Sequence, residues 1–297
     1  MDRPPASCER LASPSITNFA VSLLIFLGIL VSYLPQHYRI VRRRSSLGLS
    51  PYFVLLGTIS ATCQLANIAV LPRSRADAAC CKEISRFACV ADLLGIAQIG
   101  VQWACFSVIL VLFFIYFPRS KSSILAPAKD AEAPSPRTAL AVTIACVVHG
   151  IITAGISLYL ILAHPEVTQV WANILGIVSA VLALIQYLPQ IYTTFKLKKV
   201  ASLSIPMMCI QTPGGFLWAG SLAARLGPEG WSTWGVYVVT GCFQGTLLIM
   251  GLYFKLKDRR RRTAEEDDAS QKSADHANGN PQSNDSSEQT PLLRSAE

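Results

Sequence analysis

The chain has few charged residues and no recognisable catalytic motif. Asp, Glu, Lys and Arg make up only 15% of its 297 residues, whereas 52% are hydrophobic and the mean hydropathy is +0.40. It contains no nucleophile–base pair, no phosphate-binding glycine loop and no His/Cys set with metal-ligand spacing. The sequence therefore predicts a membrane protein that is not an enzyme and needs no cofactor or metal.

The basic character of the chain does not indicate nucleic-acid binding. The net charge of +8 comes from residues that flank apolar runs, and no aromatic and basic surface accompanies them. We interpret these residues as topology signals and contacts with anionic lipids. The first fifteen residues also lack the short apolar core and cleavage site of a signal peptide, so the first apolar run should stay as an anchor.

Nine cysteines follow no metal-ligand spacing. Five of them lie inside apolar runs, where a free thiol behaves as a small apolar group: Cys63, Cys105, Cys146, Cys209 and Cys242. Cys80 and Cys81 instead fall in a polar loop. Either can pair with Cys8, but solvated free thiols are an equal alternative, and the sequence leaves both open.

The apolar residues are concentrated in seven runs long enough to cross a bilayer. A spanning helix needs about 20 mostly apolar residues. The runs cover residues 16–40, 51–71, 87–117, 140–163, 168–195, 204–226 and 233–254. After Asp258 the chain has too few apolar residues to bury, so the tail should be disordered.

The tripeptide Leu-Pro-Gln occurs twice, each time late in an apolar run and just before basic residues. At a constant offset, seven residues of the first copy match seven of the second: Tyr33, Leu34, Pro35, Gln36, Tyr38, Leu49 and Ser50 with Tyr187, Leu188, Pro189, Gln190, Tyr192, Leu203 and Ser204. Internal similarity near half the chain length is typical of a transporter built from two related helix bundles.

With seven runs and two Pro-Gln repeats, each followed by Gly-Leu-Ser or Ser-Leu-Ser, the chain resembles the PQ-loop proteins over residues 16–254. That family includes lysosomal cystine and vacuolar cationic amino acid carriers and is related to the SWEET carriers. The resemblance implies an all-α fold of seven transmembrane helices, arranged as two parallel three-helix bundles joined by an inverting linker helix. The corresponding parts are a short N-terminus at 1–15, bundles at 16–117 and 168–256, a loop and linker helix at 118–167, and a tail at 257–297.

Lys and Arg in short loops are retained on the cytoplasmic side of a membrane. One face of the predicted bundle is richer in them, at residues 39–44, 119–137, 196–199 and 255–262. The other face has fewer, and several lie close to acidic residues. The charge pattern therefore predicts a lumenal or extracellular N-terminus and a cytosolic C-terminus.

Pro35 and Pro189 should bend their helices near the cytoplasmic ends, because a proline inside a helix cannot donate to the carbonyl one turn earlier. The amides of Gln36 and Gln190 can serve the freed carbonyls. The bends are either a matched pair of hinges or fixed kinks. Pro51 and Pro206 mark the starts of the next helices, and the resemblance implies that they join Pro35 and Pro189 in a cytoplasmic gate.

Polar residues inside the spans are the candidates for binding a solute. Gln64 and Asn67 share a helical face, although related cationic amino acid exporters often carry Asp where Gln64 stands. Gln98 and Gln244 occupy equivalent places in the two bundles and are expected to face a central cavity, and Trp218 to close over a solute. Hydrogen bonds between helices are the alternative role for the glutamines.

Asp92 is the acidic residue that we place within a span, in a run that resembles an acidic motif of the exporters. In a low dielectric it can carry a coupling proton. Alternatively it is solvated or paired with Arg86. Near the C-terminus, Glu288, Leu292 and Leu293 resemble an acidic dileucine signal read by cytosolic sorting adaptors, which favours the vacuolar or lysosomal membrane.

These features predict a secondary transporter that moves a small organic solute, such as an amino acid or related metabolite, by alternating access and with proton coupling. Its partners would be the lipid bilayer, the solute and protons. A seven-helix receptor or nutrient sensor that signals through the tail is one alternative. A scramblase-related role in lipid asymmetry is another.

Overall fold

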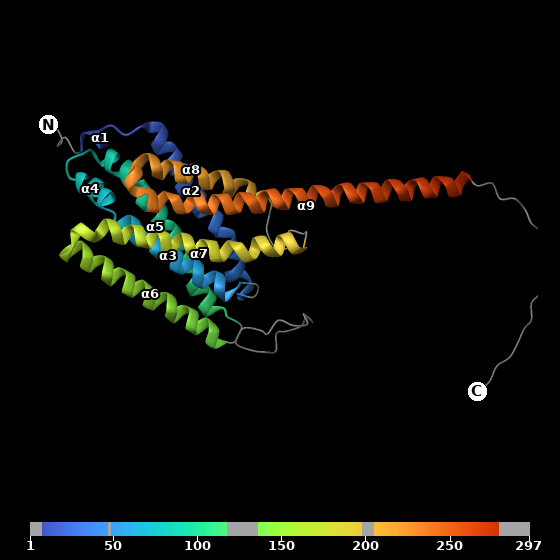
Figure 1. Ribbon diagram of the computed structural model, residues 1–297, viewed down its shortest axis with the longest axis horizontal. Coiled ribbons are helices and arrows are strands. Elements are labelled where there is room, and N and C mark those ends of the chain that lie inside the picture. The colour runs from blue at the N-terminus through green and yellow to red at the C-terminus, as the bar shows by residue number, and fades with distance from the viewer. Residues whose placement is uncertain (1–7, 47–48, 118–135, 198–204, 279–297) are drawn as a thin grey trace, which may run out of the picture. The chain divides into compact units, whose positions relative to one another are not determined.

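The computed structural model describes residues 8–46, 49–117, 136–197 and 205–278, and these ranges contain helices and no β-strand (Figure 1). The α-helices are α1 (Glu9–Ala12), α2 (Ile16–Arg43), α3 (Pro51–Val70), α4 (Pro72–Cys80), α5 (Arg86–Ile115), α6 (Pro136–Ala163), α7 (Thr168–Leu197), α8 (Ile205–Leu226) and α9 (Trp231–Asn278). Short 3-10 turns at Pro165–Val167 and Pro228–Gly230 precede α7 and α9. The prediction of an all-α protein is confirmed.

Six helices in the described ranges are long and apolar enough to cross a membrane: α2, α3, α5, α6, α7 and α9. α8 occupies the predicted sixth span with 22 residues. It is less apolar than the others because it contains Gln211, Thr212, Pro213 and Arg225. The structure thus supports six of the predicted spans, and the seventh stays a prediction.

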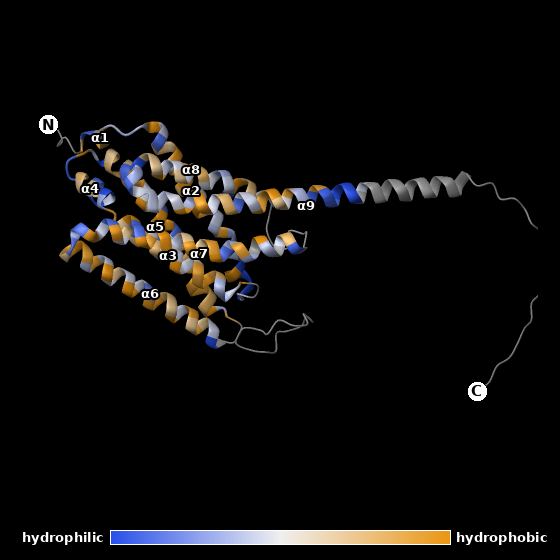
Figure 2. Cartoon of the chain, viewed as in Figure 1, coloured by the Kyte–Doolittle hydropathy of each residue, from blue (hydrophilic) through white to orange (hydrophobic). Residues whose placement is uncertain are grey.

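The outer surface of the bundle is apolar. Along α6, for example, Ile151 and Leu162 are 67% and 75% exposed, and Ile152, Leu158 and Tyr159 are exposed beside them. Figure 2 shows apolar residues over most of α5, α6 and α7, in contrast to the hydrophilic α4. Such a continuous apolar surface is unfavourable in water and suits lipid. The chain is a multi-pass membrane protein.

The arrangement as two related three-helix bundles stays a prediction, and the two sets of helices named here serve to describe the contacts between helices. α5 packs against both α2 and α3, and we call these helices the first triplet. We call α7, α8 and α9 the second triplet: Gly241 of α9 lies against the Phe216 ring of α8, and Gly176 of α7 against Ser232 of α9. A Cβ added at Gly176 would lie 2.3 Å from the Ser232 carbonyl oxygen, so only glycine permits this approach. α3 contacts α7 across the interface, and α6 packs on α3.

The tail differs from its prediction. α9 continues as a helix to Asn278, so the prediction of disorder beginning at Asp258 is wrong for residues 258–278. This stretch contains no Gly or Pro, and Arg261 and Arg262 precede Glu265 and Glu266 by four residues, a spacing that stabilises a helix. Sequence reasoning weighed only burial and overlooked this local propensity. Glu288, Leu292 and Leu293 lie outside the described residues.

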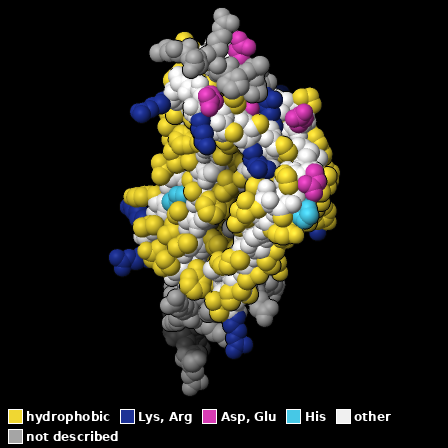
Figure 3. All heavy atoms as spheres, turned by 90° about the vertical axis from the view of Figure 1, so that its left-hand side faces the viewer, with side chains coloured by type: hydrophobic (Ala, Val, Ile, Leu, Met, Phe, Trp, Pro, Cys, Tyr) yellow, Lys and Arg dark blue, Asp and Glu magenta, His cyan; other side chains and the backbone are white. Residues whose placement is uncertain are grey.

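One end of the bundle contains α1, α4 and the turns before α7 and α9, and we call it the N-terminal face. Two disulfides lie on this face. Cys8 pairs with Cys80, and Cys81 pairs with Cys89. The alternative of free thiols at Cys80 and Cys81 is therefore wrong. Cys89 was overlooked as a partner because it begins an apolar run. Figure 3 looks onto this face, where acidic and basic side chains lie among apolar ones.

The Cys8–Cys80 disulfide should contribute measurably to stability. It closes a loop between residues 72 apart, and such a link typically stabilises a fold by about 2–4 kcal/mol. Replacing both cysteines with Ser should lower the thermal midpoint of the purified protein in detergent. Cys209→Ser, at an exposed free thiol, is the control and should leave the midpoint unchanged. Absence of a linked Cys8–Cys80 peptide in a non-reducing digest would contradict the assignment.

Candidate functional site

Near the N-terminal face, buried hydrogen bonds connect the first triplet to α8. The hydroxyls of Ser22 in α2 and Ser221 in α8 lie 3.0 Å apart. The Arg225 guanidinium donates to the same Ser22 hydroxyl at 2.7 Å. Gln98 of α5 donates to the Ser22 backbone carbonyl at 2.7 Å. Ser22 and Gln98 are completely buried, so these bonds form away from solvent.

A second set of bonds at this level is centred on Asn67 of α3. Its amide nitrogen donates to the Ala172 carbonyl at 2.6 Å and to the Ser232 hydroxyl at 3.0 Å. Its amide oxygen accepts from the Thr233 hydroxyl. Asn67 therefore joins α3 to α7 and α9. We call Ser22, Asn67, Ser221, Arg225, Ser232 and Thr233 the clasp.

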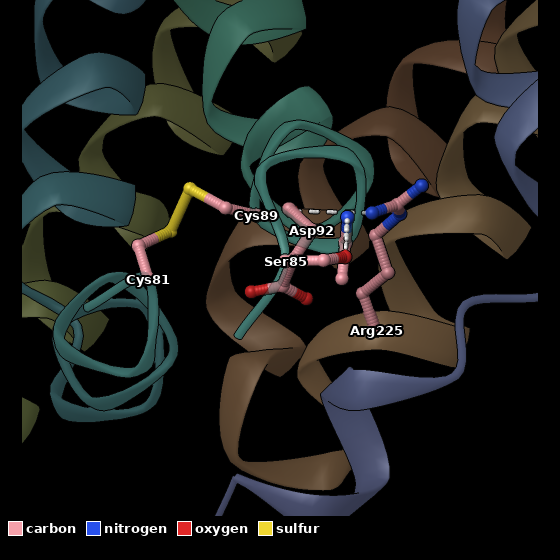
Figure 4. The surroundings of a disulfide bond; sticks show 6 residues. Cys81, Ser85, Cys89, Asp92 and Arg225 are labelled. Atoms are coloured by element: carbon pink, nitrogen blue, oxygen red, sulfur yellow. Dashed lines mark hydrogen bonds between the residues drawn. A yellow bond between two sulfur atoms is a disulfide. The ribbon is translucent and has the colours of Figure 1, made fainter. Parts of the chain in front are cut away.

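Asp92 lies beside the clasp without an ion pair. Arg225 donates to the backbone carbonyls of Ala91 and Asp92, the latter at 3.1 Å (Figure 4). The Asp92 Oδ2 atom is buried and has no hydrogen-bond partner. Among the described residues no ion pair links Asp92 to Arg225 or to Arg86, which is exposed. The alternative of an Asp92–Arg86 pair is therefore wrong.

Two cavities adjoin the Asp92 and Arg225 side chains. One of about 200 Å³ is lined by Asp92, Arg225, Asn18, Ser15 and other residues of the N-terminal segment and α5. A smaller one is lined by Asp77, Asp92 and Arg225. Asp77, in α4, forms an ion pair with Arg73 at 3.3 Å. Burial raises the pKa of Asp77, although the Arg73 guanidinium acts in the opposite direction.

Deeper in the bundle, aromatic and amide side chains of both triplets meet. The Tyr237 hydroxyl of α9 donates to the Gln102 amide oxygen of α5 at 3.0 Å. The Tyr33 side chain of α2 lies close to the same Gln102 side chain. The ring of Trp218 lies 4.1 Å from that of Tyr237, and its indole nitrogen is buried without a partner. We call Tyr33, Gln102, Trp218 and Tyr237 the central cluster.

Gln64 is another buried group whose side chain could form further hydrogen bonds. Its side chain in α3 is 3% exposed, and neither its amide nitrogen nor its amide oxygen has a partner. One turn earlier in α3, the Ser60 hydroxyl lies 2.7 Å from that of Ser179 in α7. Gln64 thus lies at the level where α3 meets the second triplet.

The two glutamines at equivalent positions have separate partners. Gln98 donates to Ser22, as described above, whereas Gln244 of α9 donates to the Gln211 amide oxygen of α8 at 3.1 Å. The predicted facing pair is therefore not formed. The bond of Gln244 stays within the second triplet and matches the alternative of hydrogen bonding between helices.

The Pro-Gln motifs lie inside continuous helices. Pro35 and Pro189 are exposed within α2 and α7, and Gln36 is half-buried. Pro51 is the first residue of α3 and Pro206 the second residue of α8, as predicted, although the Ser50 hydroxyl makes no capping bond. The Gln190 side chain lies outside the described ones. The hinge assignment stays a prediction.

Sequence reasoning missed Tyr33 and Arg225 as site residues. Tyr33 is matched by Tyr187 in the duplicated motif. The duplication was therefore a signal for Tyr33. Arg225 is the one charged residue in the sequence of α8, which was a second signal.

Comparisons with known proteins agree with this geometry. Residues 17–74 and 171–231 each match the PQ loop repeat family. The two matches cover α2 with α3, and α7 with α8, so both contain a Leu-Pro-Gln motif. An uncharacterized protein of Schizosaccharomyces pombe is 34% identical over 276 residues, which are 89% of this chain and 88% of that protein. Two matched repeats in a multi-pass helical bundle show that this transporter-like chain belongs to the PQ loop repeat family.

Proposed function

We propose that the protein is a secondary transporter that moves a small organic solute, such as an amino acid or related metabolite, by alternating access. The observation that carries the proposal is the unpartnered polar atoms at the interface of the triplets. The Gln64 amide and the Trp218 indole nitrogen are buried without partners. An unpartnered polar group inside a membrane is costly, and a polar solute would supply the missing partners.

Hydrogen bonds close the interface on one side. The clasp joins the triplets near the N-terminal face, and the Ser60–Ser179 bond joins them further along α3. Rocking the triplets about Pro35 and Pro189 would open the clasp and close the opposite side.

We place the N-terminal face in the lumen and the opposite face in the cytosol. The richer set of Lys and Arg residues lies at the cytosolic ends of the spans. Cys8, Cys80, Cys81 and Cys89 all form disulfides on the N-terminal face, and disulfides persist in oxidising compartments. Export from a vacuole or lysosome, with Asp92 as the proton carrier, fits this orientation.

Transport should depend on Gln64. In vesicles containing the purified protein, an acidic outside buffer and a panel of labelled amino acids would identify a transported solute. Gln64→Leu removes both the amide nitrogen and the amide oxygen. It should lower uptake of the solute by about 10- to 100-fold, which is the effect of losing one or two buried hydrogen bonds to a solute. Thr143→Val is the control, because that hydroxyl bonds only to its own helix at Ala139. Uptake unaffected by Gln64→Leu would refute the proposed binding site.

A further inference from the structure

Within the described ranges, the hydrogen bonds of Arg225 all go to the first triplet, although Arg225 belongs to the second. Its guanidinium donates to the backbone carbonyls of Ala91 and Asp92 in α5 and to the Ser22 hydroxyl in α2. A charged side chain within a membrane helix is costly, so its position needs a specific set of partners. One side chain thus ties α8 to two helices across the interface.

The bonds of Arg225 are coupled to the rest of the clasp through Ser22. The Ser22 hydroxyl also contacts the Ser221 hydroxyl, and its carbonyl accepts from Gln98. Movement of α8 away from α2 and α5 would therefore break the Arg225 and Ser221 contacts together. An unpaired guanidinium left in the interface would oppose this movement.

Two carboxylates lie beside Arg225 and can pair with its guanidinium once its bonds to the backbone carbonyls break. Asp92 and Asp77 line the same small cavity as Arg225, and Asp92 Oδ2 has no hydrogen-bond partner in the part of the chain that the structure describes. The Cys81–Cys89 disulfide attaches the chain after α4 to α5 one turn before Asp92 (Figure 4). Both acids are thereby held on the first triplet, next to the backbone carbonyls that Arg225 now contacts.

We infer that Arg225 is the latch of the lumenal side: it holds the triplets together through the backbone carbonyls of α5, and it exchanges them for the Asp92 and Asp77 carboxylates when that side opens. This inference rests on the proposed alternating-access function. It assigns Arg225 a positioning role in the conformational cycle, distinct from contact with the solute. The exchange keeps the guanidinium paired in both states, so opening does not strand a charge in the membrane.

Lumenal accessibility of the interface tests the latch without requiring a known solute. The reporter is Ile99→Cys, a position 1% exposed in the core between the triplets. It is introduced after replacing the five free cysteines, with both disulfides retained: Cys63, Cys105, Cys146, Cys209 and Cys242. A membrane-impermeant maleimide added on the lumenal side then reports how often that side opens.

Arg225→Met should raise the labelling rate about tenfold or more, because the buried bonds that favour the closed side are lost, whereas the ion pairs of the open side form in water and stabilise it little. Arg225→Lys should give a smaller increase, since an ammonium can keep some of these contacts. Asp92→Asn should slow labelling by removing the partner of the open state. Arg86→Met, at an exposed arginine on the same face, should leave the rate unchanged.

Equal labelling of Arg225→Met, Arg225→Lys and the parent protein would overturn the latch. If Arg225→Met does not fold, Arg225→Lys and Ser221→Ala are measured instead. Labelling rates equal to that of the parent protein in both variants would also overturn the latch. The failure of the transport proposal is distinguishable from the failure of the latch. In that case the wild-type protein would move no solute into vesicles, but the differences in labelling rate between the variants would persist.

Discussion

Linking α2 to α8 by a disulfide between Ser22→Cys and Ser221→Cys is expected to reduce transport to background. The two hydroxyls lie 3.0 Å apart in the closed clasp, so thiols at these positions can be oxidised with little movement. The covalent bond would prevent the separation of α2 and α8 that alternating access requires. Solute uptake into vesicles before and after oxidation measures the effect.

The single variants provide the controls for this cross-link. Ser22→Cys and Ser221→Cys each disturb the clasp but cannot form the bond, so oxidation should leave their uptake unchanged. Mass spectrometry establishes the fraction of the double variant that is linked. Full uptake by a completely linked double variant would show that the clasp does not open during transport.

Replacing Pro35 and Pro189 together by Leu should lower uptake at least about tenfold while the protein stays folded. Leucine restores a backbone N–H that can donate to the carbonyls of Val31 and Ile185, and it removes the ring that crowds them. A proline inside a helix costs about 3 kcal/mol relative to a good helix former, so the double variant should be at least as stable as the parent. Loss of transport without loss of stability is the signature of a hinge.

Pro213→Leu is the matched control, because Pro213 also lies inside a helix but outside the duplicated motifs. Uptake rates and thermal midpoints of the three proteins should be measured in the same vesicles and detergent. Uptake that survives in the Pro35→Leu, Pro189→Leu variant would identify the prolines as fixed kinks that shape packing. Equal loss in Pro213→Leu would indicate a general effect of helix straightening.

The local structure followed closely from the sequence. The predicted spans at 51–71, 168–195 and 204–226 correspond to α3, α7 and α8 within a few residues. Long apolar runs allow few conformations in lipid, since every backbone polar group must be bonded within a helix. The same reasoning failed beyond Asp258, where α9 continues because helix propensity, rather than burial, decides the conformation of a polar segment.

The residues of the site were only partly visible in the sequence. Gln64 and Trp218 were identified as polar or aromatic residues at membrane depth, and the structure places both in buried positions with unused donors. The pairing of Gln98 with Gln244 was expected from their equivalent positions, but each bonds to a nearer partner. Equivalent positions in a repeat share a place along the helix, whereas the facing direction of each side chain depends on packing.

The sequence by itself determined the helical spans, the duplicated proline motif and the membrane class, because these depend on the local pattern of apolar residues and on chain chemistry. Only the tertiary structure decided that Cys81 pairs with Cys89, that Arg225 binds the α5 carbonyls, and that Tyr237 donates to Gln102. The physical reason is that the residues that meet in the folded protein lie far apart along the sequence. Arg225 and its acceptors lie more than 130 residues apart, and no local propensity specifies which helices meet.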